Sequence, residues 1–176
     1  MGDTLITIIA IALAAVLMFV FPLMTMSDRT DDVSQLTVEA ATTDFVDKAR
    51  TTGKITQANY DEFLETITST GNTYDVELVV QVKDSNLGKK ASQAQADKIG
   101  ENVYYSVYTS QIQEVMDNDT ATHTYYCKEG DIISASVKNT NQTISQQMKN
   151  FFYTVTGNDS YTIAAEHAGI VTANGK

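Results

Sequence analysis

The chain has 176 residues, with 12 Lys and Arg against 22 Asp and Glu and a formal net charge of -10. Such an acidic chain does not favour nucleic acid or anionic lipid head groups as partners, because both require clustered Lys and Arg. The single cysteine, Cys127, excludes an intramolecular disulfide, so the fold must be held by packing. We expect Cys127 to be a small buried side chain on a strand.

The first predicted element is an apolar helix from Leu5 to Met24, a run without a charged side chain. As a helix this run spans about 30 Å, the hydrocarbon thickness of a bilayer. A cleaved signal peptide would have a basic leader and a small-residue cleavage site, whereas only Asp3 is charged before the run. A helix buried in a soluble core is usually shorter. Residues 1–26 are therefore predicted to form a transmembrane helix.

Five positions of this helix are candidates for membrane anchoring and assembly. Ala10 and Ala14 lie on one side of the helix, and small residues let helices approach closely in lipid. The alternative is that these alanines only reflect the apolar composition. Pro22, the only proline in the chain, removes one backbone hydrogen bond and predicts a bend near the end of the run. Leu5 and Phe19 belong to the same apolar surface.

Residues 27–72 are predicted to form an amphipathic helical segment. Apolar residues recur at helical spacing from Val38 to Ala49, and Gly53 gives a stop signal. Thr56 is a suitable N-cap for a second helix, whose apolar residues recur every three or four positions.

Residues 73–176 are predicted to form an α+β head. We expect a half-buried strand, a helix, two strands joined as a hairpin, a helix that begins with a capping box, and a final strand. Their ranges are 74–82, 99–116, 122–127, 131–137, 143–157 and 160–171. The polar segment 83–98 between the first two is predicted to be a loop or the frayed start of a helix. This β-α-β-β-α-β order is typical of a ferredoxin-like fold, an antiparallel sheet with helices on one face.

The sequence contains no pattern that indicates catalysis or metal binding. His123 and His167 are not at metal-ligand spacings, and residues 117–119 lack the later glycine and glutamate of a calcium loop, so they predict a helix stop. Phosphate-loop, dinucleotide and nucleophile-elbow motifs do not occur. The pair Asp31 and Asp32 is interpreted as solvated charge near the membrane exit. We expect no cofactor, no metal and no enzymatic activity.

The order of an apolar helix, an amphipathic helix and a small α+β head resembles a type IV pilin or pilin-like subunit. Within it, residues 45–78 and 130–153 resemble short pilus-assembly proteins, akin to TadE-like minor pilins of tight-adherence systems in anaerobic Gram-positive bacteria. The resemblance implies an envelope location, an outward-facing head and assembly through the N-terminal helix. The chain departs from the family's processing site, because no basic residue precedes Gly2 and Thr7 stands where that family has Glu.

The leading hypothesis is a single-pass, non-enzymatic pilin-like subunit or accessory protein of a bacterial surface pilus or secretion apparatus. Its expected partners are the membrane and other pilin-like or secretion-system subunits. Arg29 alone favours a cytoplasmic head, whereas the resemblance implies an extracytoplasmic one, which we adopt. The alternative is a membrane-tethered binding or sensor module with a ferredoxin-like head, and a membrane-bound enzyme is the third hypothesis. The tyrosines at 104, 105 and 108 fit a binding surface and equally a helix packed on a sheet.

Overall fold

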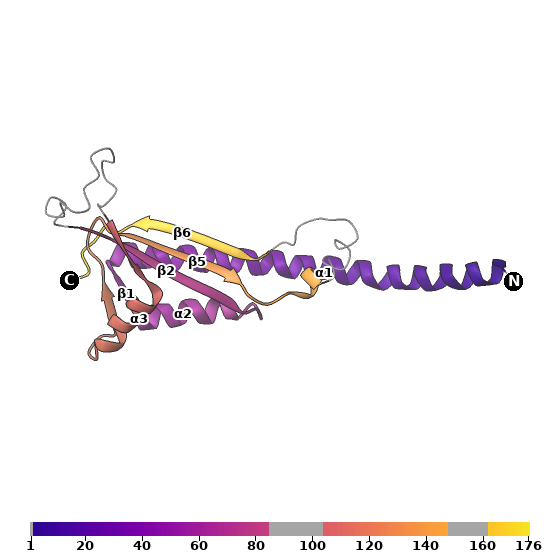
Figure 1. Ribbon diagram of the computed structural model, residues 1–176, viewed down its shortest axis with the longest axis horizontal. Coiled ribbons are helices and arrows are strands. Elements are labelled where there is room, and N and C mark those ends of the chain that lie inside the picture. The colour runs from indigo at the N-terminus through magenta and orange to yellow at the C-terminus, as the bar shows by residue number, and fades with distance from the viewer. Residues whose placement is uncertain (1, 85–103, 148–161) are drawn as a thin grey trace, which may run out of the picture.

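Helix α1 (Gly2–Thr52) contains both the apolar run and the first amphipathic segment in one continuous helix of 51 residues. The computed structural model describes residues 2–84, 104–147 and 162–176. In it, the N-terminal half of α1 projects from the head, and the C-terminal half lies along the sheet (Figure 1). The helix continues through Pro22 and ends at Gly53, whose φ is 68° and whose N–H donates to the carbonyl of Ala49. The predicted apolar helix and its continuation to Gly53 are confirmed.

Two antiparallel sheets form the β part of the head. The four-stranded sheet has the order β3-β2-β5-β6, and the two-stranded sheet pairs β1 with β4. The bounds of the strands are β1 (Lys54–Thr56), β2 (Tyr74–Lys83), β3 (Tyr104–Tyr108), β4 (Thr124–Tyr126), β5 (Ile132–Asn139) and β6 (Ala164–Ile170). Two shorter helices complete the described elements, α2 (Gln57–Thr68) and α3 (Thr109–Asn118). The molecule is therefore α+β, with a long apolar N-terminal helix and small antiparallel sheets.

The core lies between the four-stranded sheet and the helices α1 and α2. Alternate side chains of β5, Ile133, Ala135 and Val137, are buried on one face, as the period of two in a strand requires. Phe45 of α1 stacks on Phe63 of α2 with ring centroids 4.8 Å apart. These contacts bury one side of the C-terminal half of α1, which thereby becomes part of the head.

Several local predictions are confirmed. The Thr56 side chain accepts a hydrogen bond from the N–H of Asn59 at 3.2 Å and caps α2. The Thr143 side chain accepts from the N–H of Gln146, whose own side chain accepts from the N–H of Thr143, which completes the capping box. The strands predicted at 74–82 and 160–171 appear as β2 and β6. The predicted loop residues 85–98 and the predicted helical residues 99–103 and 148–157 lie outside the described residues.

Two predictions about the head are wrong. Residues 104–108 form the strand β3 rather than the start of a helix, because aromatic and β-branched side chains favour a strand and residues four apart share a face in either structure. The runs 122–127 and 131–137 contain strands, but β4 pairs with β1 while β5 pairs with β2 and β6. The ferredoxin-like order is accordingly not confirmed. The short strand β1 was not predicted.

Candidate functional site

The projecting half of α1 is the most exposed apolar surface of the described residues. Every residue from Gly2 to Phe19 is exposed, and the most apolar window of the helix has a mean hydropathy of 2.8 and is not buried inside the structure. Among the described residues, α1 is the one helix that is long and apolar enough to cross a membrane, by length and composition. An apolar surface of this size requires lipid or protein around it.

The structure places the five predicted anchor and assembly positions on this projecting half. Leu5 and Phe19 are 61% and 71% exposed, and Ala10, Ala14 and Pro22 are exposed as well. None of these five side chains contributes to the core of the head. Their surroundings must therefore come from outside this chain.

A polar junction attaches α1 to the head just beyond the apolar run. The Thr143 hydroxyl donates to the carboxylate of Asp31 at 2.7 Å, and the Ser145 hydroxyl contacts the carboxylate of Asp28. Residues 144–147 are helical, and the N-terminal end of a helix stabilises nearby carboxylates. Asp31 is buried at 6% exposure, so its interpretation as solvated charge is wrong, whereas Asp32 is exposed. These contacts fix the direction in which the apolar helix leaves the head.

The sequence contains a signal for this junction. Asp31, Ser34 and Val38 recur at intervals of three and four, which places all three on the side of α1 that is buried. Thr143 was predicted as a cap, but its contact with Asp31 spans 112 positions of the chain. Such a contact depends on the tertiary fold.

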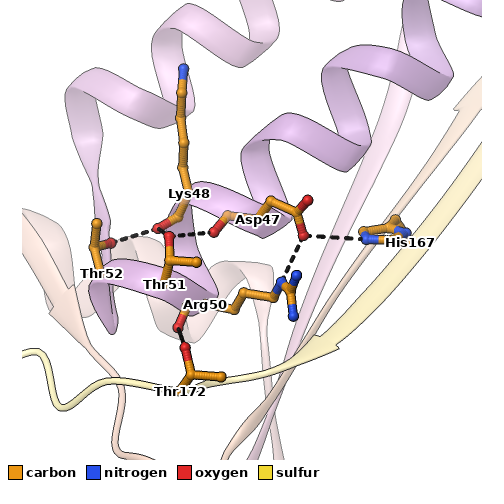
Figure 2. A network of polar contacts seen from close by, with 7 residues as sticks. All are labelled: Asp47, Lys48, Arg50, Thr51, Thr52, His167 and Thr172. Carbon is orange, nitrogen blue, oxygen red and sulfur yellow. Dashed lines mark hydrogen bonds and ion pairs between the residues drawn. The ribbon is translucent and has the colours of Figure 1, made fainter.

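A second polar network ties the other end of α1 to β6 (Figure 2). The carboxylate of Asp47 accepts from Arg50 Nε at 2.6 Å and lies 3.7 Å from His167 Nε2. The Arg50 guanidinium, through this hydrogen bond, is the main cause that lowers the pKa of Asp47. Thr172 donates its backbone N–H to the carbonyl of Arg50 at 3.0 Å. The network is half-exposed and holds the helix against the sheet.

A cleft lies at the end of the head away from the projecting helix, at the seam between the two sheets. Its volume is about 280 Å³. The lining residues are Val82, Tyr105, Val115, Tyr125, Tyr126, Lys128, Asp131 and Lys176. Burial is the main cause that raises the pKa of Tyr125, and the Lys176 ammonium lies 5.2 Å from the ring centroid of Tyr126. The cleft therefore combines aromatic rings with two lysines and one carboxylate, a lining of apolar surface and a few polar groups that is typical of a ligand site.

The tyrosines of β3 belong to the edge of the sheet. Tyr104, Tyr105 and Tyr108 are 39%, 51% and 52% exposed, so they do not form the predicted helix packed on a sheet. Only Tyr105 lines the cleft, together with the tyrosines of β4. The grouping was missed because the two strands lie about twenty positions apart in the chain and belong to different sheets.

The described residues contain no group of three or more His, Cys, Asp or Glu side chains able to hold a metal ion. Asn118 ends α3, and Asp119 caps the following turn through bonds from Thr122, as the predicted helix stop requires. Cys127 is buried directly after β4, and burial, followed by the Asp131 carboxylate, raises the pKa of its thiol to about 12. This thiol is therefore protonated and unreactive near neutral pH.

Comparison of the chain with protein-family models, curated proteins and solved structures gave no match.

Proposed function

We propose that this chain is a single-pass, pilin-like subunit or accessory protein of a bacterial surface pilus or secretion apparatus that assembles through its N-terminal helix. One observation carries the proposal: α1 is exposed at every residue from Gly2 to Phe19, and its run from Leu5 to Met24 contains no charged side chain. A helix with this pattern is stable inside a membrane or among other apolar helices.

The polar junction supports an assembling helix rather than a flexible anchor. Because Asp28 and Asp31 are bound to the head and α1 is continuous through residue 27, the apolar half keeps one direction relative to the head. Subunits that contact one another through their helices would therefore place their heads in a defined arrangement. A helix that only anchored the head to the membrane would not need these contacts of Asp28 and Asp31 with the head.

We also propose that the head lies outside the cytoplasm. The outward orientation comes from the resemblance to pilin-like subunits. A single cysteine fits the cytoplasm or the surface of a bacterium that does not depend on disulfides, so it agrees with this orientation without selecting it. Arg29 favours a cytoplasmic head. It is the only basic residue near the apolar run, however, and it lies among acidic residues, so its effect on the orientation is small.

Disulfide cross-linking in membranes tests the assembly. The full chain with Ala14→Cys is expressed in a bacterial membrane and oxidised, and we expect cross-linked dimers and larger species. The wild-type chain is the control, because its only thiol, Cys127, is buried. An exclusively monomeric Ala14→Cys chain, together with monomeric Ala10→Cys, would contradict the subunit role.

A membrane-tethered binding module is the second candidate, and the aromatic cleft favours it. In that case the cleft, at the end of the head furthest from the membrane, would be the functional site and α1 only an anchor. Tyr126→Ala combined with Lys128→Ala separates the two roles. The double substitution should leave cross-linking through Ala14→Cys unchanged if the chain is a subunit, and it should abolish partner capture if the chain is a binding module.

A further inference from the structure

A row of apolar side chains continues along α1 beyond the apolar run, on the side that faces away from the head. Met26, Val33 and Leu36 are 69%, 57% and 65% exposed, and Ala40 is exposed as well. We call these four residues the outer face of α1.

The outer face lies opposite the buried side of the same helix. Asp31, Ser34 and Val38 are buried, and Val33, Leu36 and Ala40 each follow one of them by two positions. Two positions turn an α-helix by about 200°. The described residues of the head therefore cover one side of α1 and leave the outer face exposed.

The spacing of these residues matches that of paired helices. Phe19, Met26, Val33 and Ala40 recur every seven positions, and Leu36 follows Val33 by three. Apolar residues at this repeat form the contact between two parallel helices that coil around each other. Because Phe19 belongs to the apolar run, the same contact line runs from inside the run to residue 40.

We propose that the outer face of α1 packs in parallel against the outer face of α1 in a second copy of this chain, with Val33, Leu36 and Ala40 outside the bilayer. The inference rests on the proposed function and names the partner and the contact residues. Two copies inserted in one membrane with the same orientation have parallel helices and present the same face. The described residues of each head attach to the opposite side of the helix and leave this contact open.

The neighbouring charges exclude lipid as the occupant of the outer face. Asp28, Arg29 and Asp32 lie between the apolar run and Val33, which is about 14 Å beyond Met24 along the helix axis. These charges place the part of the outer face from Val33 onward in water, where exposed Val33 and Leu36 gain from burial against apolar partners. Arg29 lies on the same side, and its aliphatic stem can follow the contact while its guanidinium remains in water beside Asp32 of the second copy.

Cysteine cross-linking of the full chain in membranes tests this contact. Val33→Cys and Leu36→Cys are compared with Glu39→Cys, which is also an exposed position of the same helix but lies outside the outer face. We expect several-fold more cross-linked dimer from positions 33 and 36 than from position 39. Cross-linking through Ala14→Cys reports the assembly of the apolar run in parallel samples.

The outcomes separate the two proposals. Equal dimer yields at positions 33, 36 and 39, with cross-linking retained at Ala14→Cys, would overturn the outer-face contact and leave the proposed function standing. Loss of cross-linking at every position would contradict both. As a second measurement, Val33→Glu with Leu36→Glu should lower energy transfer between labelled chains in vesicles, whereas Glu39→Gln should not. Both substituted positions are exposed, so circular dichroism should show an unchanged head.

Discussion

The two halves of α1 share one secondary structure and differ in what surrounds them. Residues of the projecting half are apolar on every side and exposed, whereas the half along the sheet buries one side in the head and leaves the other in water. Helix formation alone therefore does not decide whether a helix lies in a membrane or packs on a folded domain. The arrangement of apolar side chains around the helix does, because each side must meet an apolar or a polar environment.

Phenylalanine truncation gives the largest contrast between the halves. Phe45→Ala removes a ring that is 3% exposed and stacked on Phe63, so the free energy of unfolding of the head should fall by about 3–5 kcal/mol. Phe19→Ala, at 71% exposure, should leave it unchanged. Urea unfolding of the full chain in detergent micelles, followed by circular dichroism, measures both. A similar loss for the two variants would show that the projecting half packs on the head.

A charged substitution in each half tests the same difference through its effect on membrane insertion. Leu13→Arg places a charge near the centre of the apolar run and should make membrane insertion less favourable by about 3 kcal/mol in a reporter assay. Leu36→Arg introduces the same charge at an exposed position beyond the run, and insertion should not change. A strong effect of Leu36→Arg would mean that the membrane segment extends into the head-bound half.

The end of the head-bound half depends on a glycine. Gly53 has a φ of 68°, and a Cβ added there would lie 2.6 Å from the backbone nitrogen of Gly175. Gly71 has a φ of 81°, and an added Cβ there would meet no atom within 4 Å. Gly71→Ala should cost about 1–2 kcal/mol from the left-handed backbone alone, and Gly53→Ala should cost more. Equal losses would show that the C-terminal segment does not pack closely against Gly53.

The smallest expected effect concerns the polar network of Figure 2. The pKa of Asp47 is lowered chiefly by its hydrogen bond from Arg50, so this contribution to stability is present above the unfolded pKa and is lost as pH falls through the folded pKa. Arg50→Gln should therefore weaken the loss of stability between neutral pH and about pH 3. Lys54→Gln removes the same charge at an exposed position and should not alter this pH dependence. Urea unfolding at several pH values measures it.

Local features of the head could be predicted from sequence, and pairings could not. The cap at Thr56, the capping box at Thr143 and the stop at Gly53 each depend on a few neighbouring residues. Strand β4 pairs with β1, which precedes it by about seventy positions and has only three residues. Tyr104 and Tyr108 satisfy helical and strand spacing alike, and pairing with β2 decides between them.

The sequence by itself determined the apolar helix, its length and its continuation to Gly53, because these follow from uninterrupted apolar residues and from local stop signals. Tertiary structure alone decided that Asp31 is buried against Thr143, that three tyrosines meet in one cleft, and that Val33 and Leu36 remain exposed. Burial depends on which distant segments pack against a side chain. A pattern along one helix shows two apolar sides without showing which of them the head covers.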